Sequence, residues 1–147
     1  MSTDTVGRDI LTNPFPEAQA AITARLDEVL DACELKDFDR LAAYHLAGPK
    51  FSKFDELDPL DRQDDETAMR SEVAAFSAID DLDAHADDLK IDVFGPVAVA
   101  TCVFRASFRM GGEQRSGRTR TTLVFVDAGD GGWLIAHEHY SPFLAGA

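Results

Sequence analysis

The residues best suited to chemistry lie near the C-terminal end of the chain, in the segment 133–141. Glu138 has the type of a general base, and Tyr140 can hydrogen-bond to a polar ligand. If the segment is a strand, both side chains point to one face, because they are two residues apart. His137 and His139 then share the opposite face, with an H-x-H spacing that zinc sites use.

This histidine pair has two interpretations. Trp133 and Ile135 alternate in step with the pair, so all four side chains are expected on one face. A zinc site needs further ligands, and His45 and His85 are the only other histidines. Burial at a contact between the sheets of two subunits is the favoured interpretation, and we expect no metal.

His45 is the second candidate for acid–base catalysis. It follows Tyr44 at the end of a predicted short helix. Phe51 and Phe54 come soon after, in a stretch without helical periodicity, where they would cover a cavity or plug the edge of the core. A structural role for His45, in the core or as a helix cap, is the alternative.

Arginines supply the candidate anion-binding groups. If Arg105 and Glu138 both face a pocket, their charges must be matched. They would either anchor a polar ligand or form a structural ion pair, and the sequence leaves both open. Arg115, Arg118 and Arg120 form a second group. It could be an anion patch, but exposed hairpin ends or salt bridges across a dimer are favoured in so acidic a chain.

Hydrophobic spacing places these residues on three helices followed by four strands. Apolar residues at steps of three and four predict a helix over about 16–35 and another over about 65–79, with a short helix capped by Asp37 between them. A short strand near Phe51 is also expected. Period-two alternation then predicts strands near 89–93, 97–110, 117–127 and 133–141.

Helices followed by an antiparallel meander predict an α+β fold. Because long strands twist and curl, we expect a cone-shaped curved antiparallel sheet with the N-terminal helices packed on its concave face and a small-molecule site at its mouth. The expected organisation is an N-terminal arm over residues 1–15 and a single domain over residues 16–147. The residues expected to line the pocket are Tyr44, His45, Phe51, Phe54, Phe76, Arg105, Thr121, Glu138 and Tyr140.

Charge and cysteine usage limit the classes of partner. The 27 acidic and 14 basic residues give a formal charge of −13, which opposes binding to nucleic-acid phosphates and to anionic membranes. Cys33 and Cys102 lack metal-type spacing and are expected to be free thiols. No basic segment followed by an apolar run opens the chain, so we expect a cytoplasmic protein without a signal peptide.

The segment 133–141, preceded by a hairpin turn, resembles the nuclear transport factor 2-like superfamily, in particular its SnoaL-like and ketosteroid-isomerase-like branches. The W-x-x-x-H-x-H-x-S ending is especially similar to the association domain of calcium/calmodulin-dependent protein kinase II. The resemblance covers roughly residues 16–141. It implies a cone-shaped homodimer, or a higher oligomer, with a pocket between helices and sheet. It implies no kinase, because the sequence has no Gly-rich loop, H-R-D or D-F-G motif.

The resemblance also limits the chemistry. The isomerase branch carries a tyrosine on its first helix, and this chain has none over residues 16–35, which argues against ketosteroid isomerase chemistry. The association-domain branch directs an arginine of its long middle strand into the pocket, and Arg105 matches that position. The other two arginines of that pocket correspond to positions near Leu123 and Tyr140, so the anion-binding cluster is reduced.

Two functions follow as expectations. The first is a small-molecule pocket protein that binds, or transforms by acid–base chemistry, an apolar ligand with a polar handle. As an enzyme it would be a cofactor-independent isomerase, cyclase, hydratase or dehydratase, with His45 and Glu138 as catalytic residues. The second is an association domain without catalytic activity.

Overall fold

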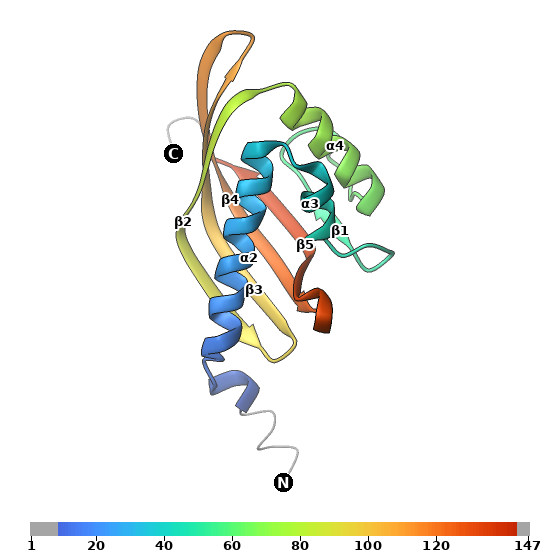
Figure 1. Ribbon diagram of the computed structural model, residues 1–147, viewed down its shortest axis with the longest axis vertical. Coiled ribbons are helices and arrows are strands. Elements are labelled where there is room, and N and C mark those ends of the chain that lie inside the picture. Colours follow the sequence, from blue (N-terminus) through green and yellow to red (C-terminus); the bar gives the residue numbers. More distant parts are fainter. Residues whose placement is uncertain (1–8, 144–147) are drawn as a thin grey trace.

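The computed structural model describes residues 9–143, and the predicted order of helices followed by strands is confirmed (Figure 1). The elements are α2 (Pro16–Leu35), α3 (Phe38–Ala43), β1 (Ser52–Phe54), α4 (Asp65–Ser77), β2 (Asp80–Phe94), β3 (Val97–Met110), β4 (Glu113–Asp127), a short 3₁₀ turn (Gly129–Gly131) and β5 (Trp133–Pro142).

The helices begin and end where the local chemistry predicts. The Asp37 side chain accepts a hydrogen bond from the backbone N–H of Arg40 and so caps α3. Asp64 caps α4 in the same way, through the N–H of Thr67 at 2.8 Å. Lys36 ends α2 in a left-handed conformation, with φ of 55°. None of the described helices is long and apolar enough to cross a membrane.

Within residues 9–143 all the strands belong to one five-stranded sheet, in the order β1-β5-β4-β3-β2. From β2 to β5 it is the predicted antiparallel meander. The short strand β1 joins the free edge of β5 in parallel, which places Lys53 opposite Glu138. Strand β2 begins at Asp80, earlier than predicted, because two register shifts, near Asp81 and Asp88, interrupt its alternation.

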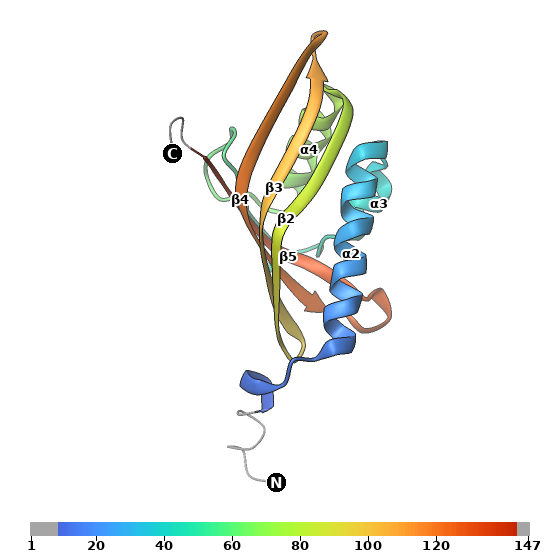
Figure 2. The same cartoon turned by 90° about the vertical axis from the view of Figure 1, so that its left-hand side faces the viewer.

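The helices cover one face of the curved sheet, and no described element covers the other (Figure 2). We call these the inner and outer faces. Ile22 of α2 and Leu41 of α3 pack on the inner face in one core cluster with Phe125 and Ile135, and these four are the largest fully buried side chains. The α+β fold with helices packed on a curved sheet is therefore confirmed.

Strand β5 carries a bulge that corrects the predicted alternation. Phe125 pairs with Ile135, whereas the preceding residue Val124 pairs with His137, so Ala136 is an extra residue. The prediction that Ile135 shares one face of the strand with His137 and His139 is therefore wrong. Trp133 and Ile135 are buried in the core with the helices. After the bulge the alternation reverses, so Glu138 and Tyr140 face inward as predicted, while His137 and His139 face outward.

Candidate functional site

A cavity of about 720 Å³ lies between the inner face of the sheet and the helices α2 and α4. We call it the cone cavity. Most of its wall is apolar, with Phe76 from α4 and Phe104 and Phe108 from β3 among its larger side chains. Cys102 and Thr121 lie opposite each other on neighbouring strands and also line it. Its polar lining residues include Lys53, Asp55, Glu72, Thr121 and Tyr140.

Lys53 is the buried cation of this site. Its side chain is only 3% exposed. The ammonium Nζ donates a hydrogen bond to Glu72 Oε1 at 2.9 Å and lies 3.4 Å from Asp55 and 3.9 Å from Glu138. It also lies 5.3 Å from the centre of the Tyr140 ring. Three carboxylates and one aromatic ring therefore surround a single lysine.

Glu138 joins the other polar groups from behind the cavity wall. Its Oε1 accepts hydrogen bonds from His45 Nε2 at 3.1 Å and from the Tyr140 hydroxyl at 3.0 Å. The other imidazole nitrogen of His45, Nδ1, contacts the Leu41 carbonyl at 2.7 Å. Glu138 Oε2 is buried without a hydrogen bond within the described chain. We call His45, Lys53, Glu72, Glu138 and Tyr140 the polar cluster.

The charges of the cluster follow from these contacts. Burial alone would lower the pKa of His45, but Glu138 and its hydrogen bond raise it to about 9, so the imidazole is protonated at neutral pH. Burial alone would raise the pKa of Glu138, but His45, Lys53 and Tyr140 lower it to about 2. The pair is therefore ionic.

Glu72 and Tyr140 respond differently. Burial and the neighbouring Glu138 charge raise the pKa of Glu72, although Lys53 and His45 act in the opposite direction. Burial and Glu138 raise the pKa of Tyr140, which keeps the phenol neutral. Burial alone would lower the pKa of Lys53, but Glu72 and Glu138 raise it, so the amine stays protonated. Glu72 is thus a cavity-lining carboxyl with a raised pKa that also contacts the buried lysine.

The cluster also contains a metal-like set of ligands. One ligand atom from each of His45, Glu72 and Glu138 lies within 4.8 Å of the others. The Lys53 ammonium is already within 4.0 Å of both carboxylates. This ammonium supplies the positive charge that a divalent ion would bring, so we assign no metal to these residues.

Arg105 lies outside the cone cavity, which corrects its predicted position. Even-numbered residues of β3 such as Phe104 and Ala106 line the cavity, so Arg105 points to the outer face. Its side chain is 48% exposed and donates a 2.7 Å hydrogen bond to Asp87. The predicted pairing of Arg105 with Glu138 is therefore wrong.

The other predicted aromatic residues surround the cavity without lining it. The Tyr44 hydroxyl donates to Glu28 of α2 and so faces that helix. Phe51 is buried and packs edge-on against His45, at 5.9 Å between ring centres. The Phe54 ring lies near the outward histidine pair, 5.8 Å from His139. Of the predicted lining residues, Phe76, Thr121 and Tyr140 do line the cavity, while His45 and Glu138 lie directly behind it.

Lys53 and Glu72 were missed by sequence reasoning. A lysine in a short strand normally points to solvent, and Glu72 lies on a helix rich in exposed acids. The signal for Lys53 was the period-two pattern of β1, which directs its side chain to the face opposite that of Ser52 and Phe54. The signal for Glu72 was its position one helical turn before Phe76. The two cysteines are free and buried, as predicted.

The comparisons with known proteins agree with this geometry. The SnoaL-like domain family matches residues 22–145. This chain belongs to the SnoaL-like domain family. None of the curated proteins compared with the sequence matches it.

Solved structures share the fold at low sequence identity. A protein of the NTF2-like family from Streptomyces avermitilis, named as a candidate dehydratase, has a TM-score of 0.79 at 19% identity over 90% of this chain and 100% of its own. An NTF2-like superfamily protein from Salmonella enterica serovar Typhimurium has a TM-score of 0.75 at 18% identity, covering 99% and 96%. The S. rosetta calcium/calmodulin-dependent protein kinase II hub has a TM-score of 0.69 at 21% identity, covering 84% and 95%.

Proposed function

We propose that the cone cavity of this SnoaL-like domain binds a neutral, largely apolar small molecule with a carbonyl or hydroxyl group, and that Glu72 transfers a proton to or from it. The observation that carries this proposal is the 2.9 Å pair between Lys53 and Glu72, in which both side chains line a largely apolar cavity. In the SnoaL-like family such a pocket suits a cofactor-independent isomerase, cyclase, hydratase or dehydratase in the cytoplasm.

The roles of the cluster follow from its hydrogen bonds. Lys53 has three N–H donors and one hydrogen bond within the described chain, so it can donate to a ligand oxygen. Glu72, with its raised pKa, accepts or returns a proton. The Tyr140 hydroxyl already donates a hydrogen bond to Glu138, and this bond holds the Tyr140 ring in position. His45 and Glu138, the predicted catalytic pair, act in this proposal by fixing Lys53 and Tyr140.

The charge balance favours a neutral ligand over a carboxylate. Lys53 and protonated His45 supply two positive charges, while Glu72, Glu138 and Asp55 supply up to three negative ones. A ligand carboxylate beside Lys53 would meet a cation that Glu72, Asp55 and Glu138 already neutralise, so the cost of desolvating that carboxylate would not be offset there. The expected polar handle is uncharged.

The test is a thermal-shift screen with three probe classes: steroid ketones, polyketide-like aromatic ketones and small carboxylates. Binding to the folded state raises Tm by mass action. We expect a neutral ketone to raise Tm, and we expect an added carboxylate not to compete with the ketone for the cone cavity. For a ketone that binds, exchange of its α-protons in D₂O is followed by NMR. Glu72→Gln should abolish the exchange, while Glu66→Gln, on the exposed side of the same helix, should not.

Two outcomes would contradict the proposal. If no ketone raises Tm, the cavity is not a site for this class of ligand. If both glutamate variants exchange α-protons at the wild-type rate, Glu72 is not the base. Ligand binding and proton transfer are thus tested separately.

Self-association is the second candidate function, and one feature of the outer face favours it. Val97 pairs with Val126, which pairs with Leu134, and this apolar row crosses three strands without a covering element in the described chain. A second copy of the chain would bury it. Light scattering should give a mass of at least two chains for the wild type, and Val126→Lys should reduce it. Leu60→Lys, in an exposed loop, is the control.

A further inference from the structure

The outer face of the sheet divides into an apolar half and a polar half. Beyond the apolar row Val97–Val126–Leu134, residues pair across β3, β4 and β5 in two mostly polar rows. The first is Thr101–Thr122–His139, and the second is Val103–Arg120–Ser141. All six point away from the helices, because they alternate with inward residues such as Cys102, Thr121 and Tyr140.

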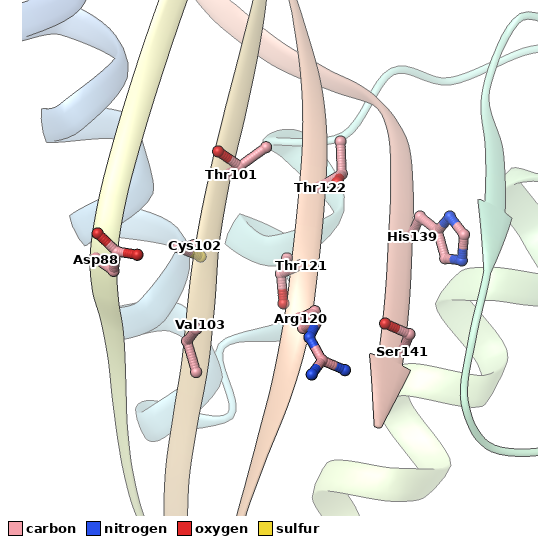
Figure 3. Close-up of a pocket in the computed structure, with 9 residues that line it drawn as sticks. All are labelled: Asp88, Thr101, Cys102, Val103, Arg120, Thr121, Thr122, His139 and Ser141. Atoms are coloured by element: carbon pink, nitrogen blue, oxygen red, sulfur yellow. The ribbon is translucent and has the colours of Figure 1, made fainter. Parts of the chain in front are cut away.

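These rows form a shallow pocket of about 420 Å³ (Figure 3). Figure 3 shows the Arg120 guanidinium on the β5 side of its strand, near Ser141, with Thr101 and Thr122 close to each other in the neighbouring row. Asp88, on β2, stands at the opposite edge of the pocket. The pocket lies behind Cys102 and Thr121, which also line the cone cavity, so the two sites are separated by one thickness of sheet.

Arg120 carries a charge that the described chain does not neutralise. Arg105 pairs with Asp87 and Arg115 with Glu113, whereas Arg120 makes no ion pair within the described residues. Its only hydrogen bond there is a long one, 3.4 Å, to the Pro142 carbonyl. The Phe143 ring lies 4.2 Å from its guanidinium carbon and limits where the group can move. In a chain with a formal charge of −13, such a cation is available for an external anion.

The hydroxyl groups around Arg120 are equally available. Thr101, Thr122 and Ser141 line the pocket, and within residues 9–143 none of their side chains makes a hydrogen bond. Hydroxyl and guanidinium N–H donors on adjacent strands are the groups that bind phosphate and carboxylate oxygens.

We propose that this outer pocket binds a small oxyanion, the phosphate or carboxylate group of a soluble ligand, through Arg120, Ser141 and Thr122. The site is independent of the chemistry assigned to the cone cavity. It assigns an anion to one member of the arginine group in β4, for which the sequence favoured exposed hairpin ends or salt bridges across a dimer. Asp88 limits the size of the anion that the pocket can bind, because its carboxylate at the opposite edge repels an anion that extends across the pocket.

The test measures binding of inorganic phosphate and of acetate by isothermal titration calorimetry at low ionic strength, where screening is weak. Arg120→Gln should weaken binding of the preferred anion about tenfold, since hydrogen bonds to charged groups are the strong ones. Arg115→Gln, the same change of charge on the same strand, should leave the affinity within about twofold. The stronger of the two anions identifies phosphate or carboxylate as the ligand group.

An opposite change tests the same site by a gain of affinity. Asp88→Asn removes the nearby negative charge and should tighten binding about twofold, whereas Asp39→Asn, on α3, should not. Light scattering on each variant separates a change in affinity from one in association. Equal loss of affinity in Arg120→Gln and Arg115→Gln, or no binding of either anion to the wild type, would overturn the proposal.

Discussion

Lys53 Nζ lies 2.9 Å from Glu72 Oε1, in side chains that are 3% and 12% exposed. The contact joins β1, the short edge strand, to α4. Lys53 also lies within 4.0 Å of Asp55 and Glu138, so it is the cation that all three carboxylates share, while His45 adds a second positive charge beside Glu138. The pair therefore has both a structural and a chemical consequence.

Removing the lysine should destabilise the fold strongly. Lys53→Met leaves Glu72 without its cation and Glu138 with His45 alone, and the loss of one partner from a buried pair costs about 3 kcal/mol. Urea unfolding at pH 7 measures this cost. The double variant Lys53→Met/Glu72→Leu should regain part of the loss, because it also removes a carboxylate. Lys90→Met, at an exposed lysine, should change stability by less than about 0.5 kcal/mol. If the double variant is no more stable than Lys53→Met, the two residues are not coupled.

The stability of the His45–Glu138 pair should depend on pH. The folded pKa of His45 is raised to about 9, above its ordinary value, so its contribution is complete below about pH 6.5 and is lost as pH rises through about 9. Glu138, with its pKa lowered to about 2, keeps its contribution until acid pH is reached. The free-energy difference between wild type and His45→Gln should therefore shrink by up to about 3 kcal/mol from pH 6 to pH 9. A difference that is constant over this range would show that His45 is neutral.

Neighbouring residues of β5 should differ sharply in their importance. Ile135 is fully buried in the core, whereas Leu134 pairs with Val126 on the outer face. Ile135→Ala should cost about 2–5 kcal/mol, and Leu134→Ala less than about 1 kcal/mol. Denaturant unfolding at one fixed protein concentration compares them. Equal costs would mean that the inner and outer faces of this strand are assigned wrongly.

Arg105 should be dispensable for ligand binding in the cone. Its guanidinium pairs with Asp87 on the outer face, so Arg105→Ala removes only an exposed contact. The rise in Tm caused by a bound ketone should be the same in this variant and in the wild type. Loss of the ketone response in Arg105→Ala, with Glu72→Gln still responding, would return Arg105 to the candidate site.

The fold was predictable from the sequence because its signals are local. Residues 16–35 repeat apolar side chains at helical spacing, and Asp37 supplies a cap that α3 uses. The meander follows from period-two alternation and glycine-containing turns. Glu138 and Tyr140 share one face of β5, as strict alternation predicts, because both lie on the same side of the bulge.

The rest of the site depends on contacts between distant segments. Nothing near Lys53 indicates that β1 pairs with β5, so its burial beside Glu138 could not be derived from local pattern. The bulge at Ala136 has no sequence signal here, and strict alternation carried Trp133 and Ile135 to the wrong face. Arg105 was placed by a family correspondence rather than by its own strand, in which Phe104 and Ala106 point inward.

The extra residue at Ala136 makes the length of β5 a stricter requirement than its composition. Substitutions before or after it act on one environment at a time. Inserting or deleting one residue between Ile135 and Glu138 would instead turn every side chain in one half of the strand to the opposite face of the sheet. It would exchange core and solvent positions, and it would turn Glu138 away from both His45 and Lys53 in a single step. Homologous chains that keep this site are therefore expected to vary in residues here but not in spacing.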